Sequence, residues 1–79
     1  MAQLIKTDGT IVKDVAVETL EQQQQLVDGY IEYVYQGDKV FIVNEEGYLR
    51  SMDFNPKASE MSGRPLVGDV VVALQSELR

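Results

Sequence analysis

Residues 29–50, GYIEYVYQGDKVFIVNEEGYLR, constrain the fold more than any other part of this sequence. Every residue of 30–35 except Glu32 is β-branched or aromatic, which is typical of a pleated, partly buried strand. Residues 40–43 are apolar throughout and fit a central strand that is covered on both faces. Residues 36–39 lie between these runs and contain a glycine that can take a positive φ, so we predict an antiparallel hairpin.

A second turn, with the sequence NEEG, is predicted at residues 44–47. It fits a type I turn that is closed by Gly47 in the left-handed region. Such a turn would return residues 48–50 beside the preceding strand as a short third strand. The expected result is a meander of three strands with an acidic tip.

Two more parts of the sequence carry strand signals. Asp8-Gly9, between the short runs 3–6 and 11–13, is a strong signal for a tight hairpin. Residues 70–74, VVVAL, are apolar throughout and predict a buried last strand.

The main helix is predicted to begin after Thr19, an N-cap candidate with Gln22 three residues later, as in a capping box. It should end near Asp28, with Gly29 as the left-handed residue beyond the last turn. Its middle is a run of four glutamines, which we interpret as a solvated helix face.

A second, shorter helix is predicted at residues 57–61. Asn55 is a capping residue and Pro56 suits the first helical position, while Gly63 would stop the helix.

The predicted order of elements, ββαβββ(α)β, indicates a small α+β domain in which one main helix packs on a mostly antiparallel sheet. The chain has 79 residues, which is enough for a single compact domain spanning 1–79. Without cysteine it has no disulfide, and a core of this size contributes only ~3–5 kcal/mol of stability, which favours a homodimer over a monomer.

Composition narrows the possible functions. The sequence contains no histidine and no cysteine, so we expect no metal, no cofactor and no catalytic residue, and no enzymatic activity. A net charge of −6 with scattered basic residues disfavours direct binding to nucleic acid. The sequence has no long apolar run, so we expect neither a signal peptide nor a membrane segment, and we expect a cytoplasmic protein.

Four short blocks carry a resemblance that covers nearly the whole chain: GYIE at 29–32, VNEEG at 43–47, NPKAS at 55–59 and LVGDVV at 66–71. Their order resembles the pattern of domain-of-unknown-function family 3846, whose members are small proteins of phages and of bacterial genomes with mobile elements. The resemblance implies a phage or mobile-element accessory protein of one compact domain, which would act in the cytoplasm of the host cell. It carries over no catalytic residue.

Seven residues are candidates for a binding site: Asn44, Glu45, Glu46, Tyr48, Asn55, Arg64 and Asp69. The two adjacent glutamates form either a solvated turn or a contact for a partner or cation; adjacent side chains on a tight turn point in different directions. The turn supplies too few oxygen ligands for a calcium loop.

The other candidates also have two interpretations. Asn55 is either a helix cap or a ligand contact. Arg64 and Asp69, in a segment with two glycines, either hold a phosphate against backbone amides or form a turn that leads into the last strand. Tyr48 and the three tyrosines of residues 30–35 either form an aromatic face for a partner or pack at the border of the core.

We therefore consider three functions. The favoured one is a non-catalytic phage or mobile-element accessory protein that binds a host macromolecule through an exposed sheet edge, the tyrosines and the acidic turn. The second is an oligomeric protein that sequesters a small nucleotide-like ligand around Arg64 and Asn55, as an antagonist of host defence. The third, least favoured, is an enzyme that uses Glu45, Glu46 or Asp69 as its base.

Overall fold

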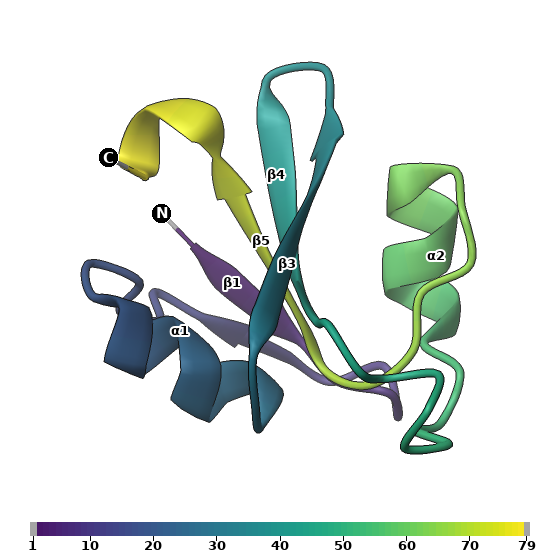
Figure 1. Cartoon of the computed structure of the whole chain (residues 1–79). Coiled ribbons are helices and arrows are strands. Elements are labelled where there is room, and N and C mark those ends of the chain that lie inside the picture. Colours follow the sequence, from purple (N-terminus) through teal and green to yellow (C-terminus); the bar gives the residue numbers. More distant parts are fainter. Residues whose placement is uncertain (1, 79) are drawn as a thin grey trace.

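A five-stranded antiparallel sheet with one helix on each face forms the framework of the computed structural model, which describes residues 2–78 (Figure 1). The strands are β1 (Gln3–Ile5), β2 (Ile11–Lys13), β3 (Ile31–Gln36), β4 (Lys39–Asn44) and β5 (Val70–Leu74), and the helices are α1 (Leu20–Val27), α2 (Pro56–Ser62) and the 3-10 turn η1 (Gln75–Glu77). The strand order is β2-β1-β5-β4-β3, so β2 and β3 are the borders of the sheet. The predicted α+β class is confirmed.

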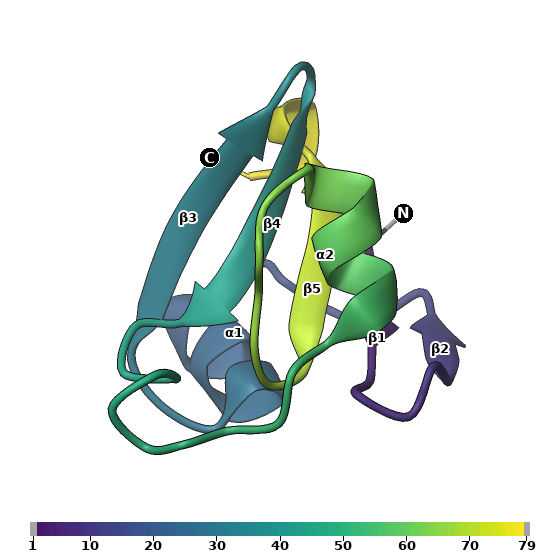
Figure 2. The ribbon, with the colours of Figure 1, turned by 90° about the vertical axis from the view of Figure 1, so that its right-hand side faces the viewer.

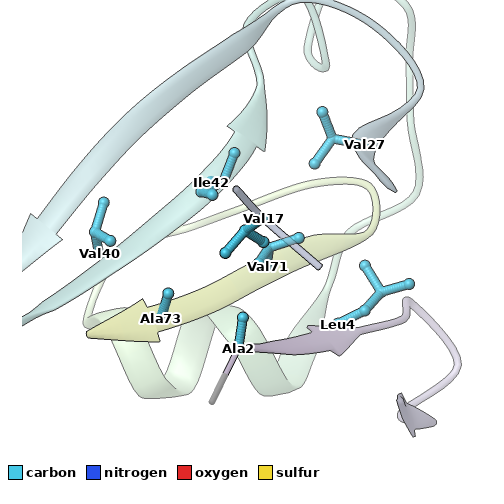
Figure 3. Close-up of a cluster of buried hydrophobic side chains, with 8 residues drawn as sticks. All are labelled: Ala2, Leu4, Val17, Val27, Val40, Ile42, Val71 and Ala73. Atoms are coloured by element: carbon cyan, nitrogen blue, oxygen red, sulfur yellow. The ribbon is translucent and has the colours of Figure 1, made fainter. Parts of the chain in front are cut away.

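Buried apolar side chains cover both faces of the central strands. On one face Val40 and Ile42 of β4 pack with Val27 of α1 (Figure 3). On the other face Phe41 of β4 packs with Ala58 of α2, which lies on the opposite side of the sheet from α1 (Figure 2). This arrangement confirms the prediction that the apolar run 40–43 is a central strand.

Both predicted hairpins are present. In the β3–β4 hairpin, Gln36 pairs with Lys39 across a two-residue loop, and Gly37 has φ 61°. The second loop residue, Asp38, is not among the residues with positive φ, and a positive φ at the first loop residue alone is typical of a type II′ turn. In the β1–β2 hairpin, Gly9 has φ 91°.

The predicted third strand of the meander, residues 48–50, does not form. Residues 45–51 instead make a series of turns, in which the N–H of Arg50 donates to the carbonyl of Glu46 at 2.9 Å. The reason is that β4 already pairs with β3 on one edge and with β5 on the other. A returning strand therefore has no free edge of β4 to join, and the observed order is ββαββαβ.

The predicted role of Gly47 is also wrong, because Gly47 is not among the residues with positive φ. A Cβ atom at this position would lie 2.7 Å from Cγ2 of Val67. Glycine is thus needed for a close approach between the turn and the segment before β5. The left-handed residue of this turn is Ser51, with φ 53°.

Helix α1 begins as predicted. The hydroxyl of Thr19 accepts the N–H of Gln22 at 3.1 Å, and the Gln22 side chain accepts the N–H of Thr19 at 3.1 Å, which completes a capping box. The C-cap of the helix differs from the prediction: Asp28 is the residue in the left-handed helical region, with φ 61°. Gly29 follows it with a positive φ of 154°.

The glutamines of α1 are not all solvated. Gln23 is only 6% exposed. Its Nε2 donates to the carbonyl of Val17 at 2.8 Å, and its Oε1 accepts the hydroxyl of Tyr33 at 2.7 Å. This side chain therefore joins α1 to the border strand β3.

Helix α2 has the predicted ends. Asn55 is its N-cap, Pro56 is its first residue, and Gly63 is left-handed at its C-cap with φ 76°. None of the helices within residues 2–78 is both long enough and apolar enough to cross a membrane.

Candidate functional site

A surface cleft of about 220 Å³ lies between the β3–β4 border of the sheet and residues 64–67. Four of the seven residues that the sequence marks as candidates line it: Asn44, Glu45, Tyr48 and Arg64. The other lining residues are Glu32, Val34, Val43, Pro65, Leu66 and Val67. The cleft therefore brings together three parts of the chain that are distant in sequence.

The floor and one wall of the cleft come from the sheet. Glu32 and Val34 are two residues apart in β3, so their side chains lie on the same face of the sheet, which is the face that carries α2. Val34 and Val43 are each 7% exposed, and Leu66 is 5% exposed. The floor is thus apolar, and Glu32 stands at its rim with its carboxylate in solvent.

The opposite wall, residues 64–67, is fixed by hydrogen bonds to α2 and its cap. The N–H of Leu66 donates to Oγ of Ser59 at 2.8 Å, and the carbonyl of Leu66 accepts the N–H of Asn55 at 2.9 Å. Phe54 and Val67 add an isolated antiparallel bridge. This wall is therefore a firmly held segment of extended chain.

Tyr48 connects the two walls. Its hydroxyl donates to the carbonyl of Pro65 at 2.6 Å, while 66% of the residue remains exposed. The ring is held in place at one end and is accessible over the rest of its surface.

Asn44 supports the cleft from below. It is 5% exposed; its Nδ2 donates to the carbonyls of Val27 and Asp28 at 3.0 and 3.1 Å, and its Oδ1 accepts the N–H of Glu46 at 2.8 Å. All the polar atoms of this side chain are used within the fold. Asn44 thus joins the end of β4 to the end of α1 and positions the turn that carries Glu45.

The charged groups at the rim are available to a ligand. Glu32, Glu45 and Arg64 are exposed, and the ion pair found within residues 2–78 lies elsewhere, between Arg50 and Asp28 at 3.3 Å. Two carboxylates and one guanidinium give this rim a negative balance. Within residues 2–78 there is no group of three acidic residues, histidines or cysteines placed to hold a metal ion.

The other three candidates lie outside the cleft. Asn55 is 0% exposed and caps α2: its Oδ1 accepts the N–H of Ala58 at 3.0 Å, and its Nδ2 donates to the carbonyls of Ile5 and Gly68 at 2.9 and 2.8 Å. Glu46 is exposed on the turn but does not line the cleft.

Asp69 lies in a separate depression of about 370 Å³. Its Oδ1 accepts the N–H of Thr7 at 3.2 Å, so it joins the β1–β2 hairpin to the start of β5.

Comparison with known proteins gave one match. The family model for a domain of unknown function, DUF3846, matches residues 1–77. This chain belongs to the DUF3846 family. The resemblance carried by the four sequence blocks is thereby confirmed. Searches of curated proteins and of solved structures gave no match.

In this DUF3846 protein, sequence reasoning missed several residues that line the cleft. The most informative is Glu32, which is the only charged residue in a strand that is otherwise apolar, aromatic or amide-bearing. That isolation was a usable signal, because a lone charge on a half-buried strand marks the position where one face opens to solvent. Pro65, Leu66 and Val67 gave no comparable signal.

Proposed function

We propose that this DUF3846 protein is a non-catalytic accessory protein of a phage or mobile genetic element, which acts in the host cytoplasm by binding a host protein. The observation that carries the proposal is the cleft. It combines a buried apolar floor with exposed acceptors at the rim, as ligand and peptide sites commonly do. Four residues singled out for their chemistry line it together.

Exposed tyrosines support a protein as the partner: Tyr48 lines the cleft, and Tyr30 and Tyr35 lie at or next to the border strand β3. Tyr30 and Tyr48 are each 66% exposed, and Tyr35 is 60% exposed. Tyrosine is enriched in protein interfaces because it offers a large amphipathic contact area with few rotatable bonds.

Charge supports the same class of partner. The chain carries a net charge of −6, and Glu32 and Glu45 add two carboxylates at the rim of the cleft. A field of this sign repels a phosphate backbone and attracts a basic protein surface.

The proposal is tested by affinity capture from a host lysate with matched variants. Tyr48→Ala removes the exposed ring, and Glu45→Lys reverses one rim charge. We expect both to reduce recovery of the same host protein at least about tenfold, as for hot-spot residues. Lys57→Ala, an exposed position on α2 away from the cleft, is the control and should leave recovery unchanged.

Two results would contradict this proposal. One is the recovery of no host protein by the wild-type chain. The other is a host protein that is recovered equally by the wild type and by both cleft variants.

A second candidate function is sequestration of a small nucleotide-like ligand by an oligomer. The observation in its favour is Arg64, an exposed cationic side chain that lines the cleft. The cleft itself, at about 220 Å³, is below the range of about 300–1,000 Å³ for drug-sized ligands and is small for a nucleotide. Arg64 would contact the anionic group. The two rim carboxylates oppose such a ligand, which places this function second.

Native mass spectrometry of protein purified gently from cells separates the two functions. A stoichiometric small mass retained on an oligomer, and lost in Arg64→Ala, would support sequestration. A species without retained mass would favour protein binding.

A further inference from the structure

The register of the β3–β4 hairpin determines which backbone groups of β3 face outward. In a two-residue hairpin the residues that flank the loop, here Gln36 and Lys39, form a hydrogen-bonded pair. At the other end of the strand the N–H of Glu45 donates to the carbonyl of Tyr30 at 2.8 Å, which fits the same alternation. The even-numbered residues of β3 therefore bond to β4.

The odd-numbered residues Ile31, Tyr33 and Tyr35 consequently direct their N–H and C=O groups away from the sheet. Within residues 2–78, no other segment donates to or accepts from this side of β3. Figure 2 shows β3 at the border of the sheet, with β4 beside it on the inner side only. β3 thus offers three N–H donors and three C=O acceptors, one of each from these three residues.

Apart from the single charge of Glu32, β3 lacks the features by which proteins usually block a sheet edge. Its six residues, IEYVYQ, include no proline and no lysine, and each of them pairs with β4 without a bulge. Tyr33 and Tyr35 are 37% and 60% exposed on the α1 face, with their rings in an edge-to-face arrangement 6.3 Å apart. An unblocked edge with exposed aromatic side chains suits the addition of a strand.

The cleft lies along the same edge, on the α2 face. If the added strand is antiparallel to β3, residues opposite Glu32 and Val34 form non-hydrogen-bonded pairs with them, and side chains are closest in such pairs. The side chain opposite Glu32 would therefore reach the rim where Glu45 also lies.

From this geometry we propose that β3 receives an extended segment of a partner protein as a sixth strand of the sheet. A lysine or arginine of that segment lies opposite Glu32 and enters the cleft, while β-branched or aromatic residues lie beside Tyr33 and Tyr35. This inference rests on the proposed function, since it specifies how the partner is held.

Charge complementarity selects a basic segment of another protein over a second copy of this chain. Two copies paired through β3 would bring their acidic rims, each with Glu32 and Glu45, towards one another, and each copy carries a net charge of −6. Like charges at an interface oppose association, whereas a basic side chain between these carboxylates is attracted.

The test begins with a display library of random twelve-residue peptides, selected on the full-length chain. We expect enrichment of sequences in which a basic residue has a β-branched or aromatic residue at i±1, the position that would lie beside Tyr33. A resynthesised peptide is then titrated against Tyr35→Pro and Tyr35→Thr. Both substitutions remove the ring, but only proline removes an outward N–H, and that N–H makes no bond within the sheet.

We expect Tyr35→Pro to weaken peptide binding at least about tenfold relative to Tyr35→Thr, since the proline ring also blocks the approaching strand. The matched control Ile11→Pro, at the start of the opposite border strand β2, should leave binding unchanged. Glu32→Lys should reverse the preference for basic peptides.

Three results would overturn the inference. Equal peptide binding to the proline and threonine variants would exclude strand addition. If Tyr48→Ala nevertheless abolished binding of the same peptides, the proposed function would stand, because the cleft would still be the binding site. A peptide-free dimer that Tyr35→Pro dissociates would show a second copy on this edge. The absence of any enriched peptide would also reject strand addition. The proposed function would then be tested separately, by affinity capture of a host protein.

Discussion

The two borders of the sheet differ in ways that bear directly on function. β2 has three residues and includes Lys13, and the chain leaves it through Asp14, which has φ 60°. Val15, rather than Asp14, donates to the carbonyl of Ala2 at 3.1 Å, as in a bulge. β3 is twice as long and has no such feature. One border is closed to further pairing and the other is open, and the cleft lies along the open one.

The largest effect on stability should come from Asn55. Its side chain donates to the carbonyl of Ile5 in β1 and to the carbonyl of Gly68, just before β5, and both strands lie in the interior of the sheet. Asn55→Ala removes the amide that donates to the carbonyls of Ile5 and Gly68 and also removes the cap of α2, which costs about 3 kcal/mol of unfolding free energy. Urea denaturation measures this loss. The exposed neighbour Lys57→Ala should stay within about 0.5 kcal/mol of the wild type. A small loss of stability in Asn55→Ala would mean that the hydrogen bonds of Asn55 to Ile5 and Gly68 contribute little to the stability of the fold.

The next effect concerns the cleft beside the open border. Gly47→Ala places a Cβ atom 2.7 Å from Cγ2 of Val67, so one wall must move, which costs about 2 kcal/mol. Gly37→Ala, in the β3–β4 loop, meets nothing within 4 Å but must adopt φ 61°, which costs about 1 kcal/mol.

Peptide or partner binding distinguishes these two glycine variants. Gly47→Ala should weaken binding because it displaces the wall, whereas Gly37→Ala should lower stability alone. Equal binding to both would show that the wall plays no part in recognition.

A smaller effect separates the two tyrosines on the α1 side of β3. Tyr33→Phe removes the hydroxyl that donates to Gln23, which leaves a buried acceptor unpaired and costs about 1 kcal/mol. Tyr35→Phe removes a hydroxyl on a side chain that is 60% exposed, and we expect a change below about 0.5 kcal/mol. Thermal denaturation of the two variants in parallel checks this difference. The reverse order would mean that α1 does not anchor β3.

The smallest effect lies in the hairpin of the closed border and depends on pH. The backbone N–H of Thr10 donates to Asp8 at 2.8 Å, and this hydrogen bond holds the pKa of the carboxyl below its ordinary value of 3.8. The contribution of Asp8 to stability is therefore complete above that value and is lost as the pH falls through the lowered pKa of the folded state. The melting temperatures of the wild type and Asp8→Ala should differ at neutral pH and converge in acid. A difference that grows in acid would contradict this assignment.

The sequence predicted the parts of the fold that depend on neighbouring residues. The hairpins at Gly9 and Gly37, the capping box at Thr19 and the cap at Asn55 all follow from local conformational preferences. These signals need only a few residues, and the structure contains all of them.

The predictions that were wrong depended on distant parts of the chain. Residues 48–50 form no strand because β5, which begins at Val70, occupies the remaining edge of β4. Gln23 is buried because it bonds to Val17 and Tyr33, which meet it only in the folded state. The sequence predicted only part of the cleft. Glu45 and Arg64 were candidates because of their charge, whereas the apolar floor forms only when the sheet is assembled.

Amide hydrogen exchange on the free and peptide-bound protein tests the open border most directly. In the free protein, we expect rapid exchange at the outward amides of Ile31, Tyr33 and Tyr35 and slow exchange at Val34, which bonds to β4. A bound basic peptide should slow the outward amides at least about tenfold and leave Ile11 of β2 unchanged. Outward amides that are already protected in the free protein, or that stay unprotected when the peptide is bound, would contradict the account.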